Sequence, residues 1–244
     1  MNNKRMRLAG AALAVSLGVV IVLAGLLSQP LYPAVHIQGS SSPDVQVEQD
    51  GGPVPDFRMD RDNLYRYSID RKRSGEVYVL VDTNFNDMAV RQGYLLANSA
   101  RAEALLRQAG RPVPVTVSFA RPLPVPDFEA LVKATGFQAD NYVLQARDLE
   151  GRLWRHGARA KPLKDGNVVD MEQIEGSFDG VVALDGNVPA TREGLGRLLE
   201  DPRVFLADVV ANEVAELVSK ETGVSPAKIH VQVFPAYSVM GGAR

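Results

Sequence analysis

The segment from Asp82 to Asp87 has the residue types and spacing closest to a recognisable chemical function. It reads DTNFND, so oxygen-bearing side chains stand at its first, third and fifth positions, as at the start of a calcium-binding loop of the EF-hand type. That loop also needs glycine at its sixth position and glutamate at its twelfth, where this chain has Asp87 and Gly93. Asp82, Asn84, Asn86 and Asp87 are therefore candidate metal ligands in an incomplete pattern.

The same residues have the types that cap the start of a helix, and we favour this interpretation. Asp and Asn accept hydrogen bonds from the free N–H groups of a first helical turn, and a carboxylate there complements the helix dipole. A helical pattern follows and runs to Gln108, with Met88, Leu95 and Ala102 recurring every seven residues. A third interpretation is that this strand-to-helix corner forms a polar rim for a ligand or peptide.

The remaining polar residues form no local catalytic signature. The sequence has no G-x-S-x-G, S-x-x-K or H-E-x-x-H motif, and its three histidines, His36, His156 and His230, fall in separate segments. A further set of acidic residues could hold a cation, but such a run is more typical of a solvated loop; it comprises Asp165, Asp170, Glu172, Glu175 and Asp179. We therefore expect no catalytic residue and no cofactor, and we predict that the protein is not an enzyme.

Trp154 is the only tryptophan of the chain. It stands in the predicted return arm of a hairpin, which follows a strand at residues 141–148 and precedes a polar, Gly-rich loop at 157–177. Aromatic residues are enriched in protein–protein interfaces, so Trp154 is a candidate interface residue. Packing in the hydrophobic core is the alternative, and we favour it.

The domain that must position these residues is expected to span residues 77–234. Residues 77–81 form a continuous apolar run rich in β-branched residues, which is typical of a strand buried on both faces. The helical pattern that follows ends before Gly110 and Pro112, which stop a helix. An alternating strand is predicted next, at residues 113–119.

The centre of the domain predicts the order strand, helix, strand, strand, helix, strand. The six elements are expected at residues 113–119, 127–135, 141–148, 181–185, 191–200 and 203–207. This is the split β-α-β, or ferredoxin-like, order, so the predicted fold class is α+β with a mixed or antiparallel sheet. Helices at 84–109 and 208–222 would flank it. In the alternative arrangement, strands at 77–82 and 228–234 are integral to one open mixed sheet.

The last strand is predicted where Ile229, Val231 and Val233 alternate with polar residues. We expect this strand to lie at an exposed sheet edge, where another chain can add a strand of its own. Ile229 and Val231 are therefore candidate interface residues.

An apolar segment at residues 8–27 determines where the domain is expected to lie. It contains no charged residue, and a helix of this length spans about 30 Å, the thickness of the hydrocarbon core of a bilayer. Lys4, Arg5 and Arg7 precede it, so the positive-inside rule predicts that residues 1–7 are cytoplasmic and that the rest of the chain is exported.

A cleaved signal peptide is the alternative interpretation of this segment. The apolar core of a signal peptide is about 7–15 residues long and is followed by a small-residue cleavage site, and this segment is longer and ends without such a site. We favour a signal anchor, and hence a single-pass protein of the cell membrane with an extracytoplasmic domain. Small residues at Gly10, Ala14, Gly18 and Gly25 would let a second helix pack closely, which is compatible with a homo-oligomer.

Three further segments are expected to lie outside the folded domain. Residues 28–56 are rich in Pro, Gly and Ser and are predicted to be a linker. Residues 57–76 are dense in both signs of charge and are predicted to be a charged segment before the domain, with 71–73 on a solvated loop rather than on anionic lipid or a partner. Residues 235–244 are predicted to be a flexible tail.

The composition excludes several classes of function. The chain has no cysteine, which removes disulfides, thiolate nucleophiles and Cys-type zinc sites. Its formal net charge is −2, and about −5 without the three basic residues that precede the apolar segment. Nucleic acid is therefore not an expected partner.

These observations favour a binding or scaffold module of the bacterial cell envelope, which acts by contact with other envelope proteins and enters the membrane through residues 8–27. In layout alone, the predicted element order on a single-pass anchor resembles the periplasmic ferredoxin-like modules of assembly proteins in secretion and pilus machines. Two alternatives belong to other classes: an exported metal-assisted hydrolase using Asp82 and Asp87, and a small-ligand sensor that works through a separate membrane partner.

Overall fold

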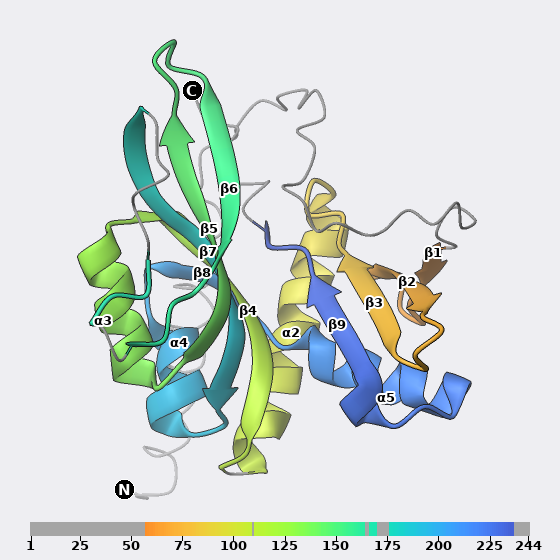
Figure 1. The fold of residues 1–244 in the computed structure, drawn as a ribbon. Coiled ribbons are helices and arrows are strands. Elements are labelled where there is room, and N and C mark those ends of the chain that lie inside the picture. The colour runs from red at the N-terminus through yellow and green to blue at the C-terminus, as the bar shows by residue number, and fades with distance from the viewer. Residues whose placement is uncertain (1–56, 109, 164–165, 170–175, 237–244) are drawn as a thin grey trace, which may run out of the picture. The chain divides into compact units, whose positions relative to one another are not determined.

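The computed structural model describes residues 57–108, 110–163, 166–169 and 176–236. These residues form a mixed α+β fold with two β-sheets and four α-helices (Figure 1). The helices are α2 (Met88–Arg107), α3 (Val125–Thr135), α4 (Arg197–Glu200) and α5 (Val210–Thr222). The predicted α+β class is confirmed for this part of the chain.

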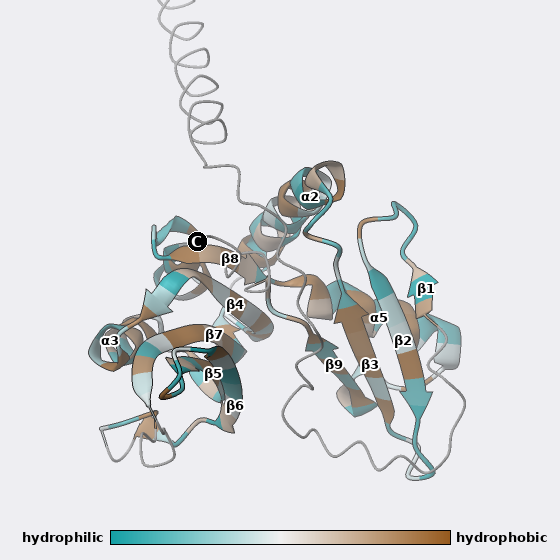
Figure 2. Ribbon diagram, turned by 90° about the horizontal axis from the view of Figure 1, so that it is seen from above, coloured by the Kyte–Doolittle hydropathy of each residue, from teal (hydrophilic) through white to brown (hydrophobic). Residues whose placement is uncertain are grey.

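One sheet has four strands in the order β1-β2-β3-β9. They are β1 (Phe57–Met59), β2 (Arg66–Arg71), β3 (Val77–Asp82) and β9 (Ile229–Val233). The first three pair antiparallel, and β9 pairs parallel to β3. Helices α2 and α5 cover one face, where they share a hydrophobic cluster with the buried valines of β3, which is largely brown in Figure 2.

Two expectations for this region need correction. Residues 77–81 are predicted to be buried on both faces, but Tyr78 is exposed because the helices cover only one face. Residues 57–76 are predicted to be a charged segment before the domain, whereas the structure pairs residues 66–71 along the whole of β3. The charged side chains hide an alternation in which Tyr67 and Ile69 face the helices.

The other sheet has five strands in the order β6-β5-β7-β4-β8, and every pair is antiparallel. The strands are β4 (Pro112–Leu123), β5 (Gln138–Arg147), β6 (Leu153–Arg159), β7 (Ser177–Pro189) and β8 (Val204–Asp208). Helix α3 follows β4, and a short π-helix η2 (Arg192–Gly196) continues into α4 after β7. The predicted order of strand, helix, strand, strand, helix, strand is found here, with β6 as an additional strand.

The strands at 77–82 and 229–233 do not belong to this five-stranded sheet. They pair with each other in the separate four-stranded sheet, so the alternative of one open mixed sheet is wrong. The physical reason is that β3 and β9 are covered by α2 and α5, which together supply a second hydrophobic cluster.

Two hydrophobic clusters support the two sheets, and three elements contribute to both. Helix α2 places Tyr94 in the cluster of the four-stranded sheet and Ala102 in that of the five-stranded sheet. In strand β8, Leu206 belongs to the cluster of the four-stranded sheet and Ala207 to that of the five-stranded sheet. At the start of α5, Val209 belongs to the cluster of the five-stranded sheet and Val210 to that of the four-stranded sheet. The passage from β8 to α5, packed against α2, is therefore where the two clusters meet.

The predicted membrane span at residues 8–27 and the linker at 28–56 lie outside the described residues, as does the tail from residue 237. In the described part of the chain, none of the helices has the length and apolar character needed to cross a membrane. Before that tail, the N–H of Ala236 donates to the Ser118 hydroxyl at 2.8 Å.

Candidate functional site

The free edge of β9 is the candidate site that sequence and structure have in common. β9 is a terminal strand and pairs only with β3 among the described residues. Two of the three predicted interface residues lie on it: Ile229 is buried in the cluster shared with α5, and Val231 is half-buried against that cluster. The structure therefore brings these two residues together at a sheet edge.

The backbone of β9 has hydrogen-bonding groups on its free side. The N–H of Phe234, just after the strand, donates to the Val81 carbonyl oxygen of β3 at 3.0 Å. Successive residues of a strand direct their backbone N–H and C=O groups to opposite sides. The backbone groups of Gln232 therefore also point toward β3, and those of Val231 point to the free edge. Such edge groups are a template for pairing with another chain.

Absence of charge distinguishes β9 from the other terminal strands of the described sheets. Strand β1 has the exposed Arg58 and β6 has Arg155 and the exposed Arg159, whereas the charged residue of β8, Asp208, is buried. β9 reads IHVQV and contains no Asp, Glu, Lys or Arg. Because charged residues on an edge oppose the addition of a strand, β9 is more open to it than β1 or β6.

The corner from Asp82 to Asp87 places its polar side chains in separate roles. The Asp82 carboxylate forms an ion pair with Arg66 across the β2–β3 pair, with a distance of 2.6 Å between Arg66 Nη2 and Asp82 Oδ2. Asp87 is the N-cap of α2 and accepts from the N–H groups of Ala89 and Val90 at 2.9 and 3.1 Å. In the described part of the chain there is no group of three or more His, Asp or Glu side chains placed to hold a metal ion.

The other two residues of that corner, Asn84 and Asn86, are both exposed. The hydrogen bonds of Asp87 fit the capping interpretation. They use the carboxylate that the calcium interpretation would need as a ligand.

Trp154 lies on β6, one of the two terminal strands of the five-stranded sheet. It is half-buried and is not a member of the hydrophobic cluster of that sheet. Its ring meets His156 edge-on, with ring centroids 6.4 Å apart. His230 lies on β9 and stacks on Tyr78 at 4.8 Å, so these two histidines belong to different sheets.

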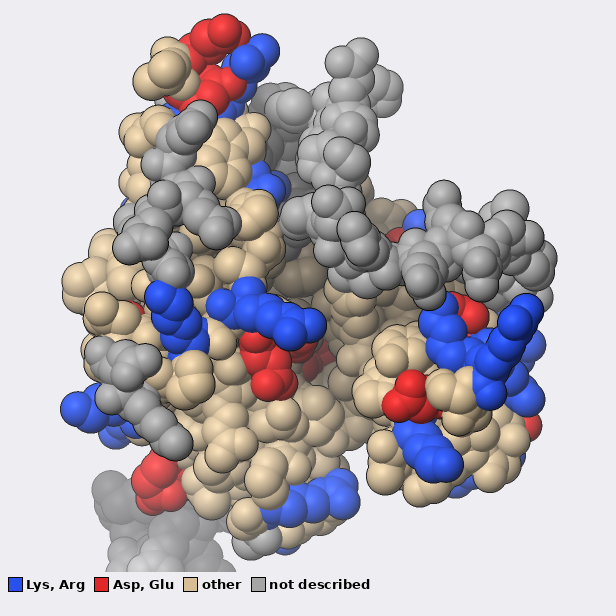
Figure 3. Space-filling view, viewed as in Figure 1, with Lys and Arg blue, Asp and Glu red and all other residues tan. Residues whose placement is uncertain are grey.

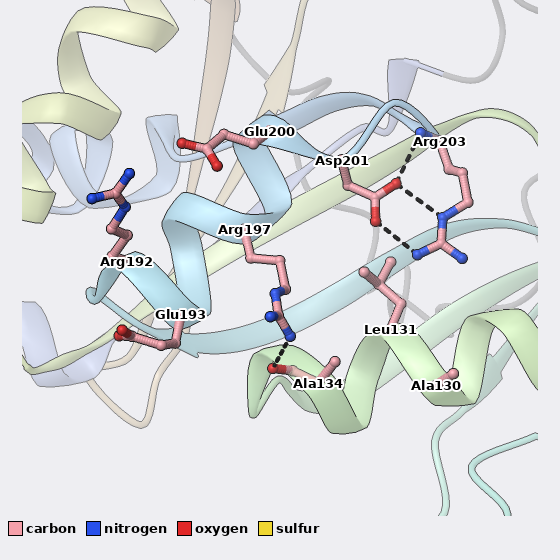
Figure 4. A pocket seen from close by; sticks show the side chains of 9 residues that line it. All are labelled: Ala130, Leu131, Ala134, Arg192, Glu193, Arg197, Glu200, Asp201 and Arg203. Carbon is pink, nitrogen blue, oxygen red and sulfur yellow. Dashed lines mark hydrogen bonds and ion pairs between the residues drawn. The ribbon is translucent and has the colours of Figure 1, made fainter.

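A groove of about 580 Å³ lies between α3 and the η2–α4 turn (Figure 4). Its charged residues are tied to the protein rather than directed at a common point. Arg203 forms a two-pronged ion pair with Asp201, and this lowers the pKa of Asp201. Arg197 donates to the Ala134 carbonyl oxygen at 3.2 Å, and Arg192 points away from both in Figure 4. The groove therefore has no convergent anion site.

A buried polar cluster joins α2 to the junction of β8 and α5. Asp208, the last residue of β8, is 3% exposed. Its carboxylate accepts hydrogen bonds from the Tyr94 hydroxyl at 2.6 Å and the Val210 N–H at 3.0 Å. Burial raises the pKa of Asp208 to about 6, against the opposing effects of these hydrogen bonds and of the positive charge of Arg101.

Arg101 continues this cluster toward the surface. Its guanidinium binds Glu213 of α5 and lies 5.8 Å from the ring centroid of Tyr65 and 6.0 Å from that of Tyr94. Burial would raise the pKa of Glu213, but the hydrogen bonds and charge of Arg101 outweigh it and lower that pKa. Burial, followed by the negative charge of Glu213, raises the pKa of Tyr65.

The contacts of this cluster hold secondary-structure elements together, and we assign it to the architecture rather than to a reaction. The pattern of a helix at 208–222 suggests Asp208 as its cap, but the N-cap of α5 is Val209, without a side-chain cap bond. The Asp208 carboxylate instead accepts from the N–H of Val210, the first residue of the helix. The other members were missed. Their signal was the spacing of Tyr94, Asn98 and Arg101, which places three polar groups on one face of a helix.

Comparison of the chain with known family models, with curated proteins and with solved structures gives no significant match.

Proposed function

We propose that this protein is a membrane-anchored binding or scaffold module of the bacterial cell envelope that works by protein–protein contact. The observation that carries the proposal is the uncharged edge of β9, which no other described strand pairs with and toward which the Val231 backbone is directed. A partner segment would add a strand there, gaining main-chain hydrogen bonds for affinity and side-chain contacts for specificity.

The arrangement of the five-stranded sheet supports a ferredoxin-like core for this module. With the hairpin strand β6 set aside, the strands lie in the order β5-β7-β4-β8. Helices follow the first and third of these strands in chain order, β4 and β7. This is the split β-α-β arrangement, which is why the layout resembles the periplasmic modules of secretion and pilus assembly proteins.

The location of the module rests on the sequence of residues 8–27. As a signal anchor, this segment would hold the chain in the cell membrane, and residues 28–56 would be the linker that joins it to β1. The partners are then other proteins of the cell envelope. No contact among the described residues favours the hydrolase or the sensor, because the Asp82 carboxylate binds Arg66 and Asp87 caps α2.

The test is crosslinking in intact cells, followed by affinity purification of the full-length protein and identification of the proteins attached to it. The informative variant is Val231→Pro, which removes the N–H on the free edge but none of those directed to β3. Val231→Ala is the matched control, because it loses more of the side chain and keeps the N–H group. We expect Val231→Pro to lose partner capture and Val231→Ala to retain it.

A fold control keeps this comparison interpretable. Replacement of His230 or Gln232 by proline removes an N–H directed to β3, so these variants show what damage to the sheet itself looks like in a thermal melt. Capture by folded Val231→Pro at the wild-type level would refute strand addition at β9. Loss of capture by Val231→Ala as well would assign binding to the side chain rather than to the edge.

A further inference from the structure

The β2–β3 hairpin ends in a run of basic residues. Arg71 is the last residue of β2, and Lys72 and Arg73 follow it in the turn. Arg71 and Arg73 are exposed. The strand register sets Arg71 level with Ile229 on the far side of β3, so the exposed Lys228, one residue before β9, comes to the same end of the sheet. We call these four basic residues the basic end.

Some of the carboxylates that alternate with basic residues in the segment 57–76 are separated from the basic end by the fold. Asp60 and Asp62 lie in the turn between β1 and β2, at the opposite end of the sheet. The backbone N–H of Tyr65 donates to the Asp60 carboxylate at 2.9 Å, so this charge serves the turn itself. The charges of both signs that predict a solvated loop at residues 71–73 therefore do not all lie together.

Two carboxylates of the hairpin lie beside the basic end, against its four cations. Asp70 binds Lys72 at 3.0 Å, and Glu76 lies 3.7 Å from Nε2 of His230. The other three residues of the basic end form no ion pair within the part of the chain that the structure describes. Figure 3 shows more blue than red side chains on the right-hand part of the molecule, which includes this sheet. The basic end therefore carries an excess of positive charge.

Tyr78 brings an exposed aromatic ring to the same end. It is the second residue of β3, is 42% exposed and stacks on His230 with ring centroids 4.8 Å apart. Nζ of Lys72 lies 5.9 Å from the centroid of the Tyr78 ring. The alternative, a solvated sheet face, predicts a polar residue at such a position, whereas tyrosine next to Lys and Arg is the combination found where a bilayer meets water.

We propose that the basic end contacts the anionic lipid headgroups of the membrane that carries the protein. This inference rests on the proposed function, because it needs residues 8–27 as the anchor. About 30 residues separate that segment from β1, and a flexible chain of this length spans about 30 Å. The six residues of β3 span only about 20 Å, so such a tether lets this end of the domain reach the bilayer surface.

The charge of the exported part favours this orientation over others. Its formal net charge is about −5, which is the −2 of the chain without Lys4, Arg5 and Arg7. An anionic surface therefore repels the domain as a whole and attracts only an end with free cations. Each cation near such a surface favours contact by about five-fold. The tether keeps the domain at a high effective concentration beside the membrane, so a few cations are sufficient.

An acidic protein segment is the alternative occupant, and the shape of the basic end disfavours it. Residues 73–75 of the hairpin turn and residues 225–228 before β9 are all exposed, so the cations stand on projecting turns. Peptide recognition uses a groove or a sheet edge, whereas projecting turns suit the flat surface of a bilayer.

The absence of cysteine from the chain permits a test with the full-length protein in vesicles. A single fluorophore is attached at Ser74→Cys in the hairpin turn, or at Asn86→Cys beyond the opposite end of β3, where the wild-type residue is also exposed. The vesicles are phosphatidylcholine with or without anionic phosphatidylglycerol, and a lipid headgroup carries a quencher. We expect the anionic lipid to raise quenching at Ser74→Cys by about three-fold or more and to leave quenching at Asn86→Cys unchanged.

Charge variants separate the basic end from the net charge of the protein. Arg73→Gln combined with Lys228→Gln should abolish the rise in quenching at Ser74→Cys. The control pair, Arg61→Gln with Arg111→Gln, removes the same charge from exposed arginines outside the basic end and should leave the rise intact. Equal quenching at the two label positions would overturn the proposal. An equal loss in the two pairs would reduce the effect to net charge and would overturn it as well.

Flotation and partner capture keep this result distinct from the proposed function. Entry into neutral vesicles reports the anchor alone, and its absence would refute the anchor together with this inference. Val231→Pro leaves the basic end unchanged, so it should lose partner capture and keep the rise in quenching. If wild type shows no rise while Arg73→Gln with Lys228→Gln loses partner capture, the basic end binds an acidic protein and the lipid proposal is wrong.

Discussion

The Tyr94 hydroxyl on α2 donates a hydrogen bond of 2.6 Å to the buried carboxylate of Asp208 at the end of β8. Tyr94 belongs to the hydrophobic cluster of the four-stranded sheet, and Ala207, next to Asp208, belongs to that of the five-stranded sheet. The bond therefore lies where the two clusters meet, and a buried ionisable group is part of the joint between them.

Stability should depend on pH through Asp208. Burial raises its pKa from 3.8 to about 6, so the folded protein holds a proton there more tightly than the unfolded chain. This group contributes stability that is fully present below about pH 4 and is lost as the pH rises through 6. Asp208→Asn removes the titration, keeps an acceptor for the Val210 N–H and offers an amide to the Tyr94 oxygen. In urea unfolding, the free energy of unfolding of the variant should rise relative to that of wild type by about 2 kcal/mol between pH 4 and pH 7.

Asp201→Asn is the control of opposite sign. The hydrogen bonds from Arg203 lower the pKa of Asp201, so its contribution is present above the unfolded pKa and is lost as the pH falls. The free energy of unfolding of this variant should therefore fall relative to that of wild type as the pH rises. A difference between Asp208→Asn and wild type that stays constant from pH 4 to pH 7 would contradict the buried titration.

Most elements of the five-stranded sheet could be predicted from local pattern. Helix α3, predicted at residues 127–135, spans Val125–Thr135 and ends at Gly136 in the left-handed conformation. The four-stranded sheet could not be predicted in this way, because β3 and β9 are separated by most of the chain. Their parallel pairing depends on shared burial under α2 and α5, which no local pattern records.

Strand β7 is longer than predicted because it contains two glycines that the sequence analysis places at its ends. The pairs Asp179-Gly180 and Asp185-Gly186 have the composition of turns, and a strand at 181–185 is expected between them. The structure instead runs β7 from Ser177 to Pro189 through both. Each glycine allows the backbone of a neighbouring strand to approach closely, so the residues that suggest turns are contact points within the sheet.

Gly180→Ala should be strongly destabilising. Gly180 has a φ of +140°, and a Cβ atom there would press on the Leu123 carbonyl oxygen and lie 2.8 Å from the carbonyl carbon. Relief would require β4 to move, and we expect a loss of about 3 kcal/mol or more in the free energy of unfolding. Gly223→Ala is the matched control, because its φ of +69° is also positive and no atom lies within 4 Å of the added carbon. It should lose only about 1 kcal/mol, and equal losses in urea unfolding would refute the close approach.

The candidate site was only partly visible in the sequence. Ile229 and Val231 could be placed on a strand from their alternation, since that pattern is local. The outward direction of the Val231 backbone depends on which side β3 occupies. Trp154 could be named as a candidate only because of its residue type. Its half-buried position on β6 depends on the order of the strands in the sheet.

Asn98→Ala should show how much the joint between the clusters depends on one amide. The Asn98 side chain is 2% exposed, donates to the Ala207 carbonyl oxygen at 2.9 Å and accepts from the Val209 N–H at 3.0 Å. Alanine leaves both main-chain groups buried without these bonds, and we expect a loss of about 2–4 kcal/mol in the free energy of unfolding.

Asn212→Ala is the matched control for this variant, since its amide donates to two carbonyl oxygens, those of Pro114 and Val209, but the first of these bonds is exposed. We expect it to lose less than about 1 kcal/mol. Because Asn98 bonds to the passage from β8 to α5, its loss should also weaken the coupling between the two sheets. Hydrogen exchange would then show the amides of β3 and β9 exchanging faster than those of β4 and β7. A uniform change across both sheets would instead mean that the protein unfolds as a single unit, with Asn98 adding stability but no separate joint.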